Sequence, residues 1–191
     1  MNAIWGPPFY WISNSEELIV KTVIDNRGNP PQASRVPDAP VIQENLGKVA
    51  PARTYQDLLT NSYDEKLFEY YMTSQLVKVN MKGKAKKIGK PGIIRRSEPS
   101  PDGQYILMET IHRPFSYLVP LSRFPFLVEI LTNEGKLIHT LRDVPLAENV
   151  PIGRDGVITG PRSFGWRSDE GSTIYYVAVS YTHLRAHETL R

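Results

Sequence analysis

The long loops of this 191-residue chain contain arginines close to aromatic or proline residues, among them Arg53, Arg113, Arg123 and Arg162. A guanidinium group is a planar fork of N–H donors, and it binds a carboxylate through two parallel hydrogen bonds. The same fork also bonds backbone carbonyls and carboxylates of its own chain and so holds loops in place. The sequence leaves both roles open for these arginines, carboxylate binding and loop fixation.

A second basic feature is a run of lysines at positions 82, 84, 86, 87 and 90. Such a run could bind phosphate groups. Alternatively, it lies on the outer strand of a hairpin, where lysine charges prevent edge-to-edge aggregation. A net charge of only +3 and the lack of interleaved aromatic residues favour the second interpretation, so we expect no nucleic-acid partner.

The sequence offers few residues of the kinds that covalent catalysis or metal binding requires. The chain has no cysteine and no serine in a Gly-x-Ser-x-Gly pattern. His112 borders a long loop, and we expect it to pack or form hydrogen bonds rather than to catalyse. His139 lies in an expected outer strand, and we expect it to be solvated or to contact the neighbouring strand. No acidic spacing resembles a calcium loop. We therefore predict no catalytic residue, no metal and no cofactor in this chain.

The elements that position these residues are hairpins in series. Three segments share a strand, a tight turn and an apolar strand: 11–20, 100–108 and 166–177. Two more hairpins turn at 81–83 and 133–135. Repeated hairpins of this kind are typical of a β-propeller, in which each blade is a four-stranded antiparallel meander. We predict an all-β fold, a partial propeller of about two and a half blades. A β-sandwich is the alternative.

In an antiparallel meander, successive connections between strands emerge alternately on two opposite faces of the fold. The hairpin turns are short and share one face, whereas the loops at 25–73, 112–125 and 142–162 are long and share the other. Long loops on a rigid scaffold are the usual place for binding. The insertion at 25–73 is proline-rich and then turns helical, with a predicted cap at Thr54 and a helix over 63–72. We expect one or two short helices there.

Composition excludes a membrane-spanning protein, because no apolar run approaches the roughly 18 residues that span a bilayer. The first residues carry no secretory signal. The last thirteen residues, 179–191, resemble a translated sequencing adapter, and we expect a domain over 1–178 followed by a non-native tail. The alternative is a real helical tail, in which His183 and His187 would have the spacing of a metal pair.

Several motifs carry a family resemblance over about 1–178. They are Arg-Thr-Tyr-Gln-Asp-Leu-Leu at 53–59, Ser-Pro-Asp-Gly at 100–103, Arg-Pro-Phe-Ser-Tyr-Leu-Val-Pro at 113–120, Ser-Arg-Phe-Pro at 122–125, and Gly-Pro-Arg-Ser at 160–163 followed by Gly-Trp-Arg at 165–167. Together they resemble the N-terminal propeller of the prolyl oligopeptidase family of serine peptidases, in its glutamyl endopeptidase-like (glutamyl aminopeptidase-like) branch. The Ser-Pro-Asp-Gly turn alone is common in propellers, whereas the other motifs in this order are more specific.

The resemblance implies a fragment of a peptidase whose propeller screens peptide substrates, while an α/β-hydrolase domain absent from this chain cleaves them. This fragment would itself not be catalytic. Arg113, Tyr117 and Arg123 are the expected substrate-binding residues, because two prolines stiffen the loop between the arginines. The alternative function is a non-enzymatic propeller used as a binding scaffold. The resemblance leaves a periplasmic or secreted location open.

Overall fold

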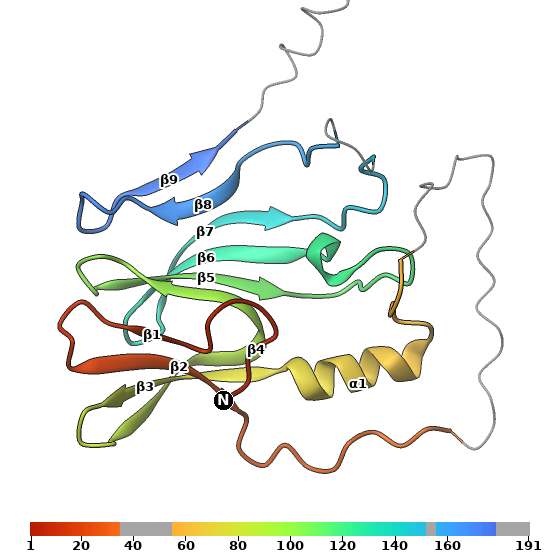
Figure 1. The fold of residues 1–191 in the computed structure, drawn as a ribbon, viewed down its shortest axis with the longest axis horizontal. Coiled ribbons are helices and arrows are strands. Elements are labelled where there is room, and N and C mark those ends of the chain that lie inside the picture. Colours follow the sequence, from red (N-terminus) through yellow and green to blue (C-terminus); the bar gives the residue numbers. More distant parts are fainter. Residues whose placement is uncertain (35–54, 152–155, 179–191) are drawn as a thin grey trace, which may run out of the picture.

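The computed structural model describes residues 1–34, 55–151 and 156–178. In these ranges the regular structure consists mostly of antiparallel strands, so the predicted all-β class is confirmed (Figure 1). The strands are β1 (Phe9–Trp11), β2 (Glu17–Val23), β3 (Ser74–Asn80), β4 (Ala85–Pro99), β5 (Tyr105–Ile111), β6 (Phe126–Thr132), β7 (Leu137–Val144), β8 (Arg162–Trp166) and β9 (Ile174–Val177). The helical segments are α1 (Ser62–Met72) and a single 3₁₀ turn at Leu121–Arg123.

The first seven strands form one continuous ladder in sequence order, and β8 and β9 form a separate hairpin. The sequence suggested separate outer and inner strands around 84–98. Instead, β4 is one strand whose first part pairs with β3 and whose second part, from Ile93, pairs with β5. Gly92 is the last residue that pairs with β3, and just before it the register shifts around Gly89 and Pro91, where a positive φ and a missing N–H interrupt the ladder. Two four-stranded meanders therefore share β4.

Side-chain alternation along β5 separates two hydrophobic cores. Ile106 and Met108 pack with residues of β2, β3 and β4 in one core. Leu107 points to the opposite face and packs with Phe164 and Trp166 of β8 in a second core. The second meander is thus covered on both faces by its neighbours. This succession of three layers with two cores fits a partial β-propeller better than a two-sheet sandwich with a single core.

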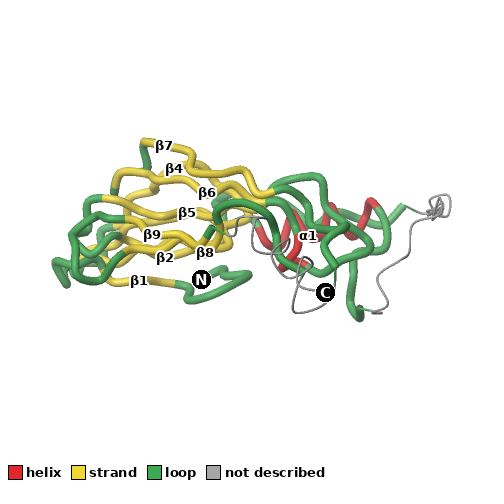
Figure 2. The backbone as a smooth tube through the Cα atoms, turned by 90° about the horizontal axis from the view of Figure 1, so that it is seen from above, coloured by secondary structure: helices red, strands yellow, loops and turns green. Residues whose placement is uncertain are grey.

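The hairpin turns lie at one end of the molecule, and α1 and the long loops lie at the other, as strand parity predicted (Figure 2). The Ser-Pro-Asp-Gly turn has the expected chemistry, because the Asp102 carboxylate accepts hydrogen bonds from Ser100 Oγ at 2.6 Å and the Gln104 N–H at 3.0 Å. Neighbouring turns also bond one another, since the Asp102 N–H donates to the Gly171 carbonyl at 3.0 Å. These contacts fix the meanders relative to one another.

The helix predicted over 63–72 is present as α1, one residue longer at its start. Residues 55–60 are not helical, and the N-cap is Asn61, whose side chain accepts from the N–H groups of Tyr63 and Asp64 at 2.9 Å each. Phe68 then packs edge-on against Phe115 and Phe124, with ring centroids 5.0 and 5.8 Å apart. The helix is therefore attached to the 112–125 loop.

Several sequence-based expectations fall outside the described residues. They concern Arg53, the Thr54 cap, and the segment 179–191 with His183 and His187. The expected division into a domain over 1–178 and a tail stays a prediction.

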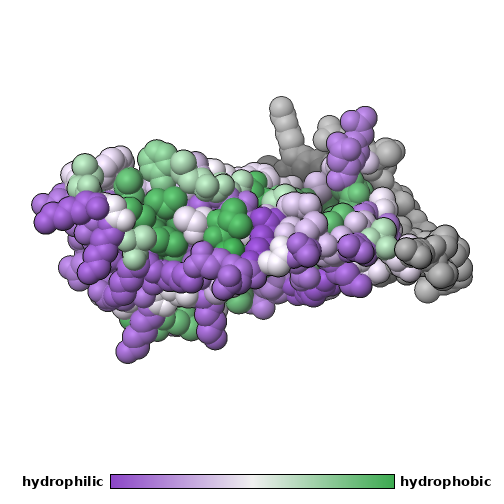
Figure 3. Space-filling model, turned by 90° about the horizontal axis from the view of Figure 1, so that it is seen from below, coloured by the Kyte–Doolittle hydropathy of each residue, from purple (hydrophilic) through white to green (hydrophobic). Residues whose placement is uncertain are grey.

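Hydrophobic side chains also reach the surface over the strand half of the molecule, where Figure 3 shows a green area bordered by hydrophilic residues. Exposed large hydrophobic residues of the strands include Phe9, Trp11, Tyr175 and Tyr176. They belong to β1 and β9, the first and last described strands, which each pair on one side only.

Candidate functional site

Arg113 contacts the inserted helix. Its guanidinium group donates two hydrogen bonds to the Glu69 carboxylate, at 2.8 and 3.0 Å, and a further short one to Glu65. It also lies over the Phe115 ring, 4.8 Å from the centroid. The bonds to Glu69, and then those to Glu65, raise the pKa of Arg113 above its ordinary value. Both acceptors belong to α1, so this side chain joins the loop to the helix.

Tyr117 lies next to the same carboxylates. Burial, followed by a hydrogen bond to Glu65, raises the pKa of its phenol. The structure therefore brings two of the three expected substrate-binding residues, Arg113 and Tyr117, together around Glu65.

Arg123 points elsewhere. Its guanidinium group donates to the backbone carbonyls of Ala147 at 3.1 Å, Val150 at 2.6 Å and Pro151 at 3.4 Å. The Ala147 N–H returns a hydrogen bond to the Arg123 carbonyl at 3.0 Å. These contacts are those expected of an arginine that fixes a loop, here the segment after β7.

The two histidines behave as expected from the sequence. The Nε2 atom of His112 lies 3.0 Å from the Asp143 carboxylate, and its Nδ1 atom lies 2.6 Å from the Arg113 carbonyl. Both ring nitrogens have partners, so neither is left to take a proton from a serine hydroxyl. His139 is exposed on β7. Within the described ranges, no group of three His, Cys, Asp or Glu residues could hold a metal ion.

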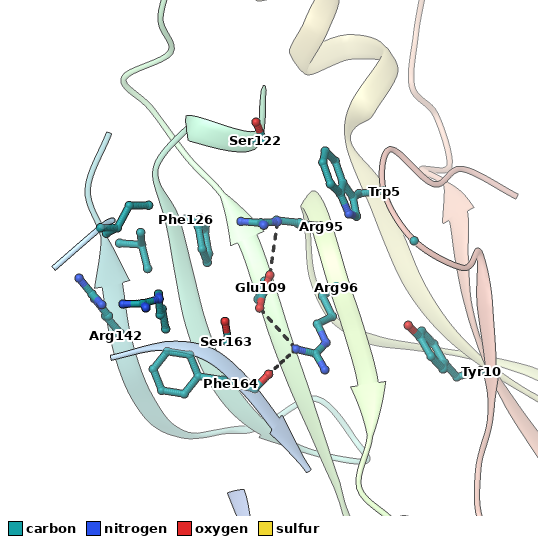
Figure 4. Close-up of a pocket in the computed structure, with 14 residues that line it drawn as sticks. Trp5, Tyr10, Arg95, Arg96, Glu109, Ser122, Phe126, Arg142, Ser163 and Phe164 are labelled. Atoms are coloured by element: carbon teal, nitrogen blue, oxygen red, sulfur yellow. Dashed lines mark hydrogen bonds and ion pairs between the residues drawn. The ribbon is translucent and has the colours of Figure 1, made fainter. Parts of the chain in front are cut away.

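A cavity of about 460 Å³ lies beside these loops, on the face of the second meander that β8 covers (Figure 4). The first strand of every meander contributes to its lining: Tyr10 from β1, Arg95 and Arg96 from β4, and Ser163 and Phe164 from β8. Phe126 of β6 and Arg142 and Val144 of β7 also line it, so the cavity extends across the second meander.

The charged residues of the cavity form a row across the sheet. Arg96 of β4 pairs in register with Glu109 of β5, Glu109 pairs with Val128 of β6, and Val128 pairs with Arg142 of β7. Residues directly opposite one another in an antiparallel ladder share a face, so all four side chains project toward β8. Arg162 approaches from β8 itself and also lines the cavity.

Glu109 is the one acidic residue among those that line the cavity, and it is almost fully buried. Its carboxylate lies 3.5 Å from Arg95 Nε and 3.7 Å from Arg96 Nη1. Arg96 also pairs with Glu98 and donates to the Phe164 carbonyl at 2.5 Å. Two guanidinium groups therefore face the same buried carboxylate.

A further cation lies behind this pair. Lys21 of β2 is buried, and its ammonium group donates to the carbonyls of Trp5 at 3.0 Å and Arg95 at 3.3 Å. Burial lowers the pKa of Lys21 to about 8, and the charge of Glu109 partly opposes that shift. Positive charge is thus in excess around Glu109.

The remaining two arginines of the cavity have different partners. Arg142 donates short hydrogen bonds to the Pro161 and Thr159 carbonyls. Arg162 carries a buried Nη1 atom for which the described residues offer no hydrogen-bond partner. Sequence reasoning selected Arg162 and missed Arg95, Arg96 and Arg142. The available signal was a pair of arginines directly after the isoleucines at 93 and 94, within a segment expected to be a strand.

Aromatic residues form the rest of the wall. The Arg95 guanidinium lies 4.3 Å from the centroid of the Phe126 ring and 5.6 Å from that of Trp5. Figure 4 shows Trp5 and Tyr10 on one side of Arg95 and Arg96, and Phe164 on the other. The cavity therefore combines cationic groups with flat apolar surfaces, a combination that suits an anionic organic ligand.

Comparison with known proteins finds two relatives of nearly the whole chain, although no family model and no solved structure matches it. The chain is 46% identical over 178 residues to a probable chloroplastic glutamyl endopeptidase of Oryza sativa subsp. japonica. It is 43% identical over 176 residues to the protein of the same name from Arabidopsis thaliana. The chain spans 19% and 18% of the length of these relatives. No helix in the described ranges is long and apolar enough to cross a membrane. The chain is thus similar, over more than nine-tenths of its length, to part of two plant proteins named as probable glutamyl endopeptidases.

Proposed function

We propose that this chain is the substrate-screening part of a longer serine peptidase of the prolyl oligopeptidase family, which acts on glutamyl peptides. The observation that carries the proposal is the 46% identity over 178 residues to a protein named as a glutamyl endopeptidase. The chain spans only 19% of that relative, so most of a peptidase of that length would lie outside the residues seen here.

Cleavage would be carried out by residues outside this chain. The sequence has no Gly-x-Ser-x-Gly nucleophile turn, and His112 uses both ring nitrogens in contacts within the fold. A serine nucleophile needs a free imidazole nitrogen within hydrogen-bond reach. In this proposal an α/β-hydrolase domain supplies both groups, and the β-meanders control which peptides reach them.

The long-loop end is the side from which we propose that peptides are selected. Arg113 is half-exposed there, and a substrate carboxylate would compete with Glu65 and Glu69 for its guanidinium group. Tyr117 lies beside it. Arg123 would act through the shape of the loop, because its donors are taken up by backbone carbonyls. None of the three takes part in bond cleavage in this proposal.

A non-enzymatic binding scaffold is the second candidate. One observation favours it: the described residues form a cationic cavity, but among them no serine is paired with a free imidazole nitrogen. The two candidates differ in whether bound peptide is cleaved.

The test is hydrolysis by the protein expressed from its complete reading frame. A fluorogenic peptide with a single glutamate is compared with its glutamine counterpart, with and without a serine-reactive fluorophosphonate. We expect faster cleavage of the glutamate peptide and loss of activity after fluorophosphonate treatment. Binding of the peptide without cleavage would overturn the peptidase proposal in favour of the scaffold, and cleavage that resists the fluorophosphonate would exclude a serine nucleophile.

A further inference from the structure

We propose that the cavity between the second meander and β8 binds the carboxylate group of an acidic peptide, and that Arg162 is the residue that contacts it. The peptide nature of the ligand rests on the proposed function. The anionic character of the ligand rests on the geometry of the cavity alone.

The first argument is the charge of the lining. Four guanidinium groups line the cavity, at Arg95, Arg96, Arg142 and Arg162, against the single carboxylate of Glu109. Partly buried cations are costly unless negative charge compensates them. Glu109 faces Arg95 and Arg96, and Glu98 also pairs with Arg96, whereas Arg142 and Arg162 form no ion pair with a described residue. A bound anion would supply the missing negative charge.

The second argument is an unused donor. Arg162 Nη1 is buried and has no hydrogen-bond partner among the described residues. Buried donors in native structures are nearly always bonded, to protein, to water or to a ligand. A carboxylate in the cavity would accept from this N–H group.

The third argument is that the site is already built before a ligand arrives. The Arg142 guanidinium bonds the carbonyls on both sides of Gly160, and a Cβ atom at that glycine would lie 3.1 Å from the Arg142 nitrogens. Gly160 also has a positive φ of 84°, which only glycine adopts without strain. This close turn leads directly into Arg162, so little conformational entropy is lost when a ligand binds.

The walls favour a peptide over an inorganic anion. Trp5, Phe126 and Ile158 offer apolar surface that a methylene chain or a peptide backbone can cover. The volume of about 460 Å³ accommodates an organic ligand and exceeds what one phosphate ion fills. Two carboxylates of a peptide would fit this chemistry, a glutamate side chain and the C-terminal carboxylate.

The experiment separates these two sources by calorimetric titration of the protein. Three peptides of the same length are compared: one with an internal glutamate and an amidated C-terminus, one with glutamine and an amide, and one with glutamine and a free carboxylate. We expect the first to bind about tenfold more tightly than the second, because it adds a charge-assisted hydrogen bond. If the third peptide binds more tightly than the first, the cavity binds the C-terminal carboxylate of the peptide instead. Equal binding of all three would overturn the proposal.

Two variants locate the effect. Arg162→Gln should remove the preference of the protein for glutamate over glutamine without lowering its melting temperature, because Nη1 has no protein partner to lose. The matched control is Arg167→Gln, which removes an exposed arginine at the turn after β8 that pairs with Asp169 and Glu170. The control should leave the preference unchanged, and Arg162→Lys should keep part of it.

Other outcomes are equally decisive. If Arg162→Gln binds the glutamate peptide as the unmodified protein does, the proposal is wrong. If inorganic phosphate displaces the peptide at a lower concentration than free glutamate does, the cavity is a phosphate site. Peptide binding in a protein that cleaves nothing would refute the proposed peptidase and leave this inference standing. Cleavage whose glutamate preference survives Arg162→Gln would refute this inference alone.

Discussion

The arginines near the long-loop end fall into two groups that differ in what their guanidinium groups contact. Arg113 and Arg123 meet acceptors of the protein itself, two glutamates in one case and three carbonyls in the other. In the cavity, Arg95 and Arg96 face the buried Glu109 and Arg142 bonds two carbonyls, whereas Arg162 keeps an unbonded donor. The first group completes the fold, whereas the cavity holds an arginine donor that an anion could use. The hydrogen-bond partners of each guanidinium group distinguish loop fixation from carboxylate binding, which the sequence alone left open.

The largest effect is expected at the single carboxylate of the cavity. Glu109→Gln removes the negative charge that faces Arg95 and Arg96 and favours the charged form of Lys21, and it leaves only Glu98 beside Arg96. We expect the free energy of unfolding to fall by about 3 kcal/mol, the usual cost of breaking a buried ion pair. Chemical denaturation measures it. Glu170→Gln, at an exposed ion pair, is the control, and an equal loss in both variants would mean that the cavity carries no excess charge.

A pH titration of stability tests the same excess in another way. The pKa of Lys21 is about 8 in the folded protein, below its ordinary value of 10.5. Between these two values the unfolded chain binds more protons than the folded one, so the free energy of unfolding should rise with pH, by about 1 to 3 kcal/mol. Burial raises the pKa of Tyr10 above its ordinary value of 10.0, so near pH 10 and above this phenol opposes the rise. In Lys21→Met this rise of the free energy of unfolding with pH should disappear. If it persists, groups other than Lys21 cause it.

Arg123 should show the behaviour of a loop-fixing side chain. Arg123→Ala removes hydrogen bonds to the Ala147 and Val150 carbonyls, which we expect to cost about 1 to 2 kcal/mol of stability. The complete protein should then lose kcat/KM equally on matched glutamate and glutamine peptides. A loss confined to the glutamate peptide would instead support direct contact with substrate.

The smallest effect is expected at Arg113. Its side chain is half-exposed, and exposed ion pairs contribute at most about 1 kcal/mol. Because Glu65 and Glu69 already occupy its donors, Arg113→Ala should reduce the glutamate preference of the complete protein less than Arg162→Gln does. The ratio of kcat/KM values on the two peptides measures this. The reverse order would show that Arg113 is the main carboxylate-binding group.

The hairpins could be predicted because their signals are local. The turn at 100–103 needs only the chemistry of Ser, Pro, Asp and Gly within four residues, and the structure forms it with Gly103 at a positive φ of 72°. The continuity of β4 could not be predicted, because Gly89 and Pro91 are typical of a strand end. Two neighbouring strands hold both halves in line despite them.

The candidate site was harder to predict because it depends on pairings distant in sequence. Arg113 meets Glu69 across 44 residues, and Arg96 meets the Phe164 carbonyl across 68. Turn and strand patterns carry no information on such contacts. Arg162 was selected from the sequence for its proline neighbour, but its unbonded donor results from the position of β8 over the second meander.

The most direct test of this account is a double-mutant cycle that joins Arg162 to the peptide carboxylate. The affinities of the unmodified protein and of Arg162→Gln are measured for the glutamate and glutamine peptides, which gives a coupling free energy between the two groups. A direct contact predicts a coupling of about 1.4 kcal/mol or more, a factor of ten in affinity, that weakens with added salt. A coupling of zero, with both peptides losing affinity equally or not at all, would contradict it.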